Sequence, residues 1–351
     1  MEKIPTTIIT GFLGAGKTSL IRHLIEQASG KRLAFLINEF GTLGIDREML
    51  LGCGIEGCDE SNVVELANGC ICCTVAEDFV PAIQQLLERD DRPDHIIIET
   101  SGLALPKPLV QAFRWPDIAH ALSVDGVVTV LDAEALAAGR VATDEAAIEL
   151  ARQADDMLDH DTPLGELFAD QLACADLVVL NKADRLEAAS LEKLSEDIQA
   201  QCPEGVALIP ARHAAVSVEV LLGIGAEAEL HIDARHTHHD HHHEDHHHHE
   251  DGEDDHHHDA FHSVSFIVPE HISPQSIKEQ MPEIIKQFGI LRVKGFLHHS
   301  EATRREVIQA VGPRIQYYFD RAWREGETPC SNLVFIASSD VDLNAAKACL
   351  K

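Results

Sequence analysis

The pattern of apolar and polar positions predicts short buried strands that alternate with helices over the first two thirds of the chain. Apolar runs without alternation indicate strands that are buried on both faces, as in a parallel sheet. Between these runs, apolar residues recur at helical spacing, as at residues 20, 21, 24 and 25. We therefore expect an α/β fold with a mostly parallel sheet. Its strands are predicted at residues 6–10, 33–37, 63–66, 94–98, 124–131, 178–180 and 206–209.

A second ordered region is predicted at the end of the chain. Residues 263–268 alternate as a strand does, and residues 277–285 carry apolar positions at helical spacing. Further strands are expected at residues 290–296, 315–319 and 333–336. We interpret residues 263–351 as a small C-terminal α+β domain with a mixed or antiparallel sheet, and residues 1–228 as the first domain.

The segment between the two domains has no apolar periodicity. Of the 32 residues at 231–262, fifteen are His and ten are Asp or Glu. Such a composition predicts a disordered linker, which we place at residues 229–262. Imidazoles at this density bind Zn²⁺, Co²⁺ or Ni²⁺ loosely, which favours a metal store or entry point. A solvated charged spacer is the alternative.

Overall charge narrows the function classes. The chain has 59 Asp and Glu against 28 Lys and Arg, which argues against nucleic-acid or anionic-membrane partners. No apolar run approaches the roughly 20 residues needed to span a bilayer. The first residues lack the layout of a signal peptide, so we expect a cytoplasmic protein whose nine cysteines are mostly reduced.

A complete phosphate-binding motif, G-x-x-x-x-G-K-[ST], lies between the first predicted strand and its helix. Its glycines let the backbone wrap an anion, and the N–H groups that open the helix point at phosphate oxygens. Lys17 supplies a charge for the terminal phosphates and is a predicted catalytic residue, while Thr18 is placed to bind Mg²⁺. The nucleotide-binding residues predicted here are Gly11, Gly14, Ala15, Gly16, Lys17, Thr18 and Ser19.

Acidic residues at strand ends are the candidates for the rest of the catalytic machinery. Glu99 ends a buried strand at the Walker B position, and Gly102 follows closely enough to approach the γ-phosphate. Asp132 ends another strand and is a rival Mg²⁺ ligand. Glu39 and Asp46 lie where phosphate-loop GTPases have a switch segment, and Glu39 is the candidate for hydrolysis.

The base is predicted from Asn181, Lys182 and Asp184, an Asn-Lys-x-Asp sequence at the end of a strand. An Asp carboxylate accepts two hydrogen bonds from guanine that adenine does not offer. The motif follows the phosphate loop in the chain order of GTPases. The nucleotide is therefore predicted to be GTP.

Three thiols within four residues, Cys70, Cys72 and Cys73, stand after a predicted strand and before a helix. That position favours thiolates, and the set suits Zn²⁺ or Co²⁺. Cys53 and Cys58 are candidate additional donors, with partly buried loop cysteines as the default interpretation. The alternative, a thiol redox switch, predicts disulfide formation within the cluster.

These motifs together resemble the CobW family of GTPases, which are relatives of HypB and UreG. The Gly-Cys-x-Cys-Cys element at residues 69–73, between the phosphate loop and Walker B, is the most specific of them. Residues 52–58 and 103–109 resemble the branch linked to cobalamin biosynthesis, which implies delivery of Co²⁺ to a cobaltochelatase. Other branches are similar to zinc chaperones, so the resemblance implies Zn²⁺ as the alternative cargo.

We hypothesise that cargo binds at Cys70, Cys72 and Cys73 in the Mg²⁺·GTP state and is released after hydrolysis. Hydrolysis is expected to be slow, because no residue is an obvious water-positioning Gln or arginine finger. The resemblance implies a metal-acceptor protein as partner and a nucleotide-dependent dimer. A storage or sensing protein dominated by the His-rich segment is the alternative from another class.

Overall fold

The computed structural model describes residues 3–27, 31–38, 63–66, 79–89, 91–144, 148, 163–235, 237, 261–300, 302–324, 327–339 and 341–351. The chain forms two compact units, the first with Met1–Pro203 and Leu208–His256 and the second with Glu204–Ala207 and His257–Lys351. Among the described residues, no helix is both long enough and apolar enough to cross a membrane.

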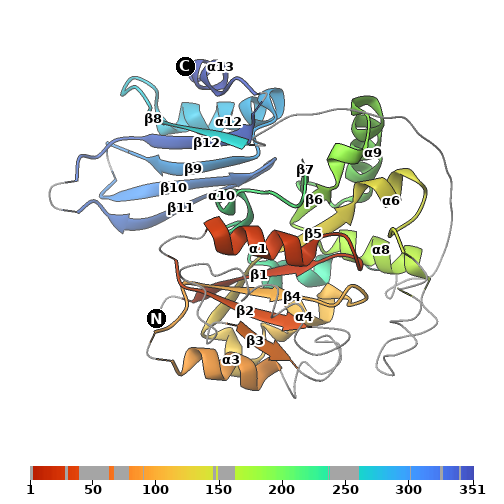
Figure 1. Ribbon diagram of the computed structural model, residues 1–351. Helices are drawn as coiled ribbons and strands as arrows, with labels where there is room; N and C mark the ends of the chain where they lie inside the picture. Colours follow the sequence, from red (N-terminus) through yellow and green to blue (C-terminus); the bar gives the residue numbers. More distant parts are fainter. Residues whose placement is uncertain are drawn as a thin grey trace. The chain divides into compact units, whose positions relative to one another are not determined.

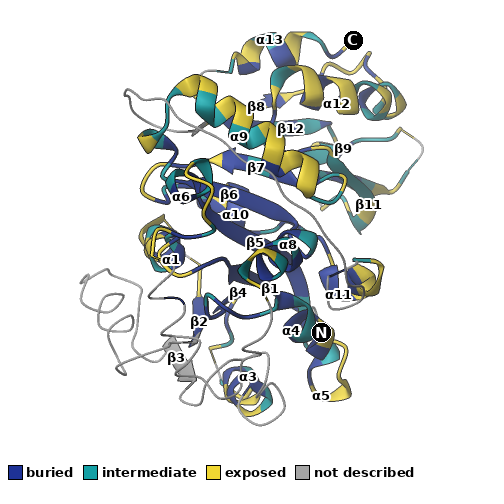
Figure 2. Ribbon diagram, turned by 90° about the vertical axis from the view of Figure 1, so that its right-hand side faces the viewer, coloured by how far each residue is buried: buried dark blue, intermediate teal, exposed yellow. Residues whose placement is uncertain are grey.

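The first unit is built on a seven-stranded sheet with the order β3-β2-β4-β1-β5-β6-β7 (Figure 1). All pairings determined from β1 to β6 are parallel, which confirms the predicted α/β fold. The central strands β1 and β5 are buried at every position but one, as apolar runs in a covered sheet require (Figure 2). The strands are β1 (Ile4–Thr10), β2 (Leu33–Asn38), β3 (Val63–Leu66), β4 (His95–Glu99), β5 (Leu122–Asp132), β6 (Leu177–Asn181) and β7 (Ala207–Pro210).

Helices cover this sheet on both faces, with α1 on one side and α4 and α11 on the other (Figure 2). Helix α1 buries Leu20, Ile21, Leu24 and Ile25, the stripe that its spacing predicts. The helical segments of the first unit are α1 (Lys17–Gln27), α3 (Val80–Leu87), α4 (Pro106–Ala112), α5 (Pro116–Ala119), α6 (Ala133–Ala137), α8 (Leu164–Ala173), η3 (Ala183–Arg185), α9 (Ala188–Gln201), α10 (Val218–Leu221), α11 (Ala228–His231) and η4 (Ile232–Ala234).

Residues 228–235, named here the anchor segment, are fastened to the first unit. Lys107 Nζ donates a 2.8 Å hydrogen bond to the carbonyl oxygen of Arg235, and Arg114 Nη1 lies 2.6 Å from Asp233 Oδ2. Arg235 Nη2 in turn lies 2.6 Å from the buried Asp176 Oδ1.

The anchor segment moves one predicted boundary. The linker was expected from residue 229, whereas residues 228–234 form α11 and η4. Ala228 and Ile232 are fully buried, and Glu229 Oε2 accepts a 2.9 Å hydrogen bond from the backbone N–H of Val124. Two apolar positions and one buried acid are too few for a periodic signal, so the hydrophobic pattern could not reveal them.

The second unit holds a five-stranded sheet with the order β11-β10-β9-β12-β8, and every pairing is antiparallel. Its core packs α12 and α13 against one sheet face, so the predicted C-terminal α+β fold is confirmed. Ser273 caps α12 by accepting a 3.1 Å hydrogen bond from Ser276 N. The elements are β8 (Phe261–Ile267), α12 (Pro274–Phe288), β9 (Arg292–Leu297), β10 (Arg304–Val311), β11 (Arg314–Ala322), β12 (Asn332–Ser338) and α13 (Leu343–Ala348).

Strand β10 was not predicted, because it begins with Arg304, Arg305 and Glu306. Yet Glu306 is buried within the unit, where its two carboxylate oxygens face a lysine and a histidine. Lys278 Nζ lies 2.5 Å from Oε1, and His299 Nε2 lies 2.6 Å from Oε2. The charge in this strand is therefore satisfied inside the fold rather than by solvent.

Candidate nucleotide site

The phosphate loop fills the connection between the end of β1 and Lys17, the first residue of α1. Its three glycines have φ angles of 132°, 78° and 107° at Gly11, Gly14 and Gly16, a region that side chains disfavour. A Cβ atom at Gly11 would lie 2.0 Å from the carbonyl oxygen of Val130 on β5. The backbone at Gly11 therefore lies so close to β5 that no residue with a Cβ atom fits there. This contact fixes the position of the loop at the carboxyl ends of the strands.

Lys17 is buried, and its ammonium group lies over the loop. Lys17 Nζ donates hydrogen bonds of 2.8 Å to the carbonyl oxygen of Gly11 and 3.3 Å to that of Phe12. These bonds hold the positive charge inside the turn whose N–H groups suit an anion. Ser19, another predicted contact, is exposed one residue beyond Thr18.

Thr18 and Glu99 meet at the carboxyl ends of two adjacent strands. Strands β1 and β4 pair in parallel with Ile9 opposite Glu99, so the residues that follow β1 lie beside the end of β4. Thr18 Oγ1 donates a 3.3 Å hydrogen bond to Glu99 Oε1. A hydroxyl and a carboxylate are the hard oxygen donors that Mg²⁺ prefers, so this pair fits the metal.

Gly102, predicted to face the γ-phosphate, packs against the phosphate loop itself. A Cβ atom at this position would lie 2.7 Å from the backbone nitrogen of Leu13. Gln171 on α8 secures the segment from the other side, because its Nε2 donates 3.3 Å hydrogen bonds to the carbonyl oxygens of Gly102 and Ala104.

Sequence reasoning missed Gln171, which is fully buried. A signal was available, since Gln171 stands among Leu167, Phe168 and Leu172 on the apolar face of α8. A polar side chain on such a face has to find a buried partner. Here the partners are the two carbonyl groups of the loop that follows Glu99.

Asn181 joins the base-recognition motif to the phosphate loop. Its Nδ2 donates a 2.8 Å hydrogen bond to the carbonyl oxygen of Ala15, and its Oδ1 accepts a 2.6 Å bond from Ala214 N. A Cβ atom at Gly16 would lie 2.3 Å from Asn181 Nδ2. Two motifs separated by 166 residues are therefore joined by a direct hydrogen bond.

The remaining base-motif residues leave the sheet in a tight turn. Lys182 has a φ of 60°, and Asp184 lies in η3 directly after it. Lys182 Nζ lies 2.5 Å from Asp132 Oδ2. Asp132, considered from sequence as a rival Mg²⁺ ligand, thus binds the lysine of the base motif instead.

The pKa of Asp132 reflects these contacts. Burial opposes its ionisation, but hydrogen bonds from Lys182, Thr143 and Ala135 N outweigh burial and hold the pKa below its usual value. The Asp132 side chain is therefore an anion in the folded protein. That charge is matched by the cation of Lys182.

Several predicted site residues lie outside the described residues. These are Glu39, Asp46, Cys53, Cys58, Cys70, Cys72 and Cys73. Within the described ranges, no group of three or more His, Cys, Asp or Glu side chains has the arrangement of a metal site.

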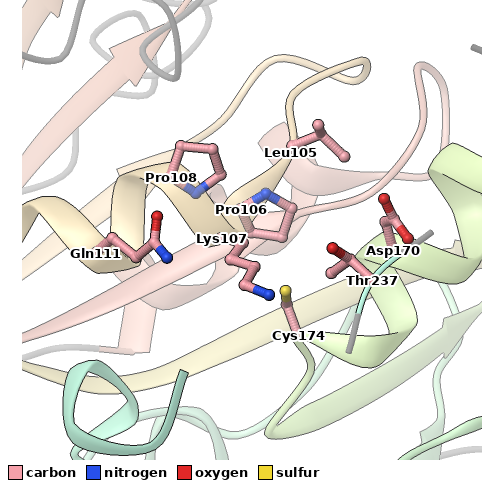
Figure 3. A pocket seen from close by; sticks show the side chains of 8 residues that line it. All are labelled: Leu105, Pro106, Lys107, Pro108, Gln111, Asp170, Cys174 and Thr237. Carbon is pink, nitrogen blue, oxygen red and sulfur yellow. The ribbon is translucent and has the colours of Figure 1, made fainter. Parts of the chain in front are cut away.

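A cavity of about 250 Å³ lies beside the loop that follows Glu99 (Figure 3). Its lining includes Leu105 and Lys107 near the start of α4, Asp170 and Cys174 from α8 and its end, and Thr237. None of these is a predicted site residue. Burial raises the pKa of the Cys174 thiol to about 12, which favours the protonated form of this sulfur in the cavity wall.

Two family descriptions match the chain. Residues 5–208 match "CobW/HypB/UreG, nucleotide-binding domain", and residues 261–351 match "Cobalamin synthesis protein cobW C-terminal domain". The first match contains the phosphate loop, Glu99, Gly102 and the base motif. The second coincides with the antiparallel unit.

Three known proteins are similar to this chain over more than half of its length. A Sinorhizobium protein named "Zinc chaperone CobW" is 47% identical over 99% of this chain and 96% of its own length. A Pseudomonas aeruginosa protein of the same name is 49% identical over 96% of this chain and 88% of its own. "Zinc-regulated GTPase metalloprotein activator 1" of Schizosaccharomyces pombe is 36% identical over 56% of this chain and 43% of its own.

Proposed function

Since the chain belongs to the CobW/HypB/UreG family and is a GTPase metallochaperone, we propose that its cargo is Zn²⁺, held by Cys70, Cys72 and Cys73 while GTP is bound. The observation that carries the proposal is the position of the strand ends from which the switch and thiol segments continue. Strands β2, β3 and β4 end together, with Asn38 opposite Leu66 and Ile37 opposite Glu99.

The distance from the sheet edge to the thiols is bounded by covalent geometry. Cys70 stands four residues after Leu66, so its Cα atom lies within about 14 Å of the end of β3. Glu39 directly follows Asn38 and stays within about 4 Å of it, Cα to Cα. The segment with the switch candidate therefore starts on the strand beside Glu99, and the segment with the thiols starts one strand further along the same edge, which supports coupling between nucleotide and cargo.

The nucleotide site has a role for each described residue. The loop from Gly11 to Gly16 and Lys17 would bind the phosphates, and Asp184 would accept hydrogen bonds from the guanine edge. Thr18 and Glu99 would hold Mg²⁺, which neutralises phosphate charge when bound. Asn181 keeps the base and phosphate halves in register through Ala15.

Hydrolysis would then release the cargo by removing the contacts made with the γ-phosphate. With the γ-phosphate present, Gly102 and the switch segment share contacts with it, and the thiols that start from the same edge gain a fixed geometry. After hydrolysis these contacts are lost, and the cargo passes to an acceptor protein.

The test is the Zn²⁺ affinity in two nucleotide states, measured by competition with a chromophoric chelator. We expect one Zn²⁺ per chain to bind at least tenfold more tightly with a non-hydrolysable GTP analogue than with GDP. Cys72→Ala and Cys73→Ala should abolish the tight site, while Cys330→Ala, outside the cluster, should keep it. Equal affinity in both nucleotide states contradicts the proposal.

Co²⁺, the cargo favoured by the sequence resemblance, is tested in the same assay. The names of the two relatives near 50% identity favour Zn²⁺. Tight Co²⁺ binding that survives equimolar Zn²⁺ in the GTP state would restore Co²⁺, with a cobaltochelatase as acceptor. Simple ligand preference predicts the opposite order.

The storage alternative rests on the His-rich segment. Deletion of residues 236–258 removes thirteen histidines. A chaperone keeps its single GTP-dependent site after this deletion, whereas a store loses most of its Zn²⁺ capacity.

A further inference from the structure

Asp132 and Lys182 form a part-buried ion pair within the predicted base motif region. The two residues lie on neighbouring strands, because Asp132 of β5 pairs with Asn181 of β6 and Lys182 follows directly. Their charged atoms are 2.5 Å apart, and the side chains of Asp132 and Lys182 are 1% and 21% exposed. The attraction between the two charges is screened less by water here than between two fully exposed side chains.

The Asp132 carboxylate is itself fixed by further bonds. Its Oδ1 accepts a 3.1 Å bond from Ala135 N and so caps α6, and its Oδ2 accepts a 2.6 Å bond from Thr143 Oγ1. Thr143 Oγ1 also accepts a 3.3 Å bond from Lys182 Nζ. Lys182 is therefore bound to a carboxylate whose two oxygens are both fixed by other hydrogen bonds.

Lys182 needs such a restraint because of its backbone. A φ of 60° is costly for a residue with a Cβ atom and persists only where the surroundings enforce it. Asn181 is fixed through Ala15 and Ala214, so the conformation of Lys182 sets the direction in which the chain continues to Asp184.

We propose that Asp132 is a positioning residue for guanine selectivity: it holds Lys182 in the left-handed turn and so aims Asp184 at the base. The inference rests on the proposed recognition of GTP by residues 181–184. It gives Asp132 a role in choosing the nucleotide and none in the chemistry at the γ-phosphate.

The test compares GTP with ITP, which lacks the exocyclic amine that Asp184 would bind. In Asp132→Asn we expect KM for GTP to rise about tenfold and kcat to stay within about threefold. The preference for GTP over ITP should fall toward unity. A merely structural loss would reduce the use of GTP and ITP equally and leave their ratio unchanged.

Glu134→Gln is the matched control. It neutralises the carboxylate that lies 2.6 Å from Arg185 Nη1 in the same turn, and the side chains of Glu134 and Arg185 are 40% and 55% exposed. This variant should keep the wild-type ratio. Thr143→Val provides a second variant, because it removes the other partner of Lys182 without a change of charge, and it should lower the ratio in the same direction.

The two proposals fail in distinguishable ways. If the wild-type protein prefers GTP to ITP and both Asp132→Asn and Thr143→Val keep that preference, the role of Asp132 is overturned while GTP recognition stands. If the wild-type protein does not distinguish GTP from ITP and ATP, recognition by residues 181–184 falls, and the role of Asp132 falls with it.

Discussion

Thr18 Oγ1 donates a 3.3 Å hydrogen bond to Glu99 Oε1 across 81 residues of chain. The hydroxyl belongs to the first turn of α1, and the carboxylate ends β4. Because β1 and β4 are parallel neighbours, their carboxyl ends deliver both groups to one place. This contact is the clearest sign that the two halves of the phosphate site are assembled in the fold.

Loss of the Thr18 hydroxyl should change how GTP hydrolysis depends on Mg²⁺. In Thr18→Ala we expect the Mg²⁺ concentration for half-maximal hydrolysis to rise at least tenfold, because one oxygen donor is gone. Hydrolysis rates measured across a Mg²⁺ titration at saturating GTP check this. Thr18→Ser keeps the hydroxyl and should stay within about threefold of wild type. An unchanged titration in Thr18→Ala would remove this residue from the metal site.

Gly102→Ala should damage the phosphate loop from outside it. The new Cβ atom would lie 2.7 Å from Leu13 N, so backbone has to move, at a cost of about 1–3 kcal/mol in unfolding free energy. GDP affinity should fall with it. Gly165→Ala is the control, since its Cβ meets nothing within 4 Å on helix α8, and it should stabilise by about 0.5–1 kcal/mol. Urea unfolding and GDP titration of both variants test the contrast.

Cys174 should resist alkylation in the native protein. Burial raises its pKa to about 12, so almost no thiolate exists at pH 8. Iodoacetamide followed by peptide mass spectrometry should modify the partly exposed Cys330 and Cys349 before Cys174. Rapid labelling of Cys174 under native conditions would contradict its buried position.

The raised pKa of Cys174 also makes the free energy of unfolding depend on pH. The unfolded thiol ionises near pH 8.5–9, while the folded thiol stays neutral up to about 12. The stability that this group contributes is present below about pH 9 and is lost as the pH rises toward 12. Cys174→Ala should therefore show a shallower alkaline loss of unfolding free energy than wild type.

Glu306→Ala should destabilise the second unit by about 3 kcal/mol, because it leaves Lys278 and His299 without their shared carboxylate. Trp323 reports on this unit when Trp115, the other tryptophan, is replaced by Phe. Denaturant unfolding followed by Trp323 fluorescence measures the loss. Glu270→Ala, an exposed acid in the same unit, should change little. Equal effects of the two substitutions would count against a structural role for Glu306.

Local patterns were enough for the parallel sheet and the phosphate loop. Apolar runs such as residues 96–98 predict buried strands from the local sequence alone, and the glycine spacing from Gly11 to Gly16 predicts the phosphate loop in the same way. The partnerships of Gln171 and Asp132 could not be predicted, because each depends on which strands become neighbours. Asp132 in particular has the same local signature as a metal ligand, and only the β5–β6 register pairs it with Lys182.

The anchor segment limits how far the histidines at 236–258 can lie from the first unit. Arg235 is fastened to Asp176 in the first unit, and the thirteen histidines at 236–258 follow it directly. Whatever their arrangement, the last of them lies within about 80 Å of Arg235, and the first within about 4 Å, measured between Cα atoms. An ion bound to these imidazoles would therefore meet the nucleotide unit at an effective concentration set by chain length. Capture would then become an intramolecular step whose rate no longer depends on how much free metal surrounds the protein.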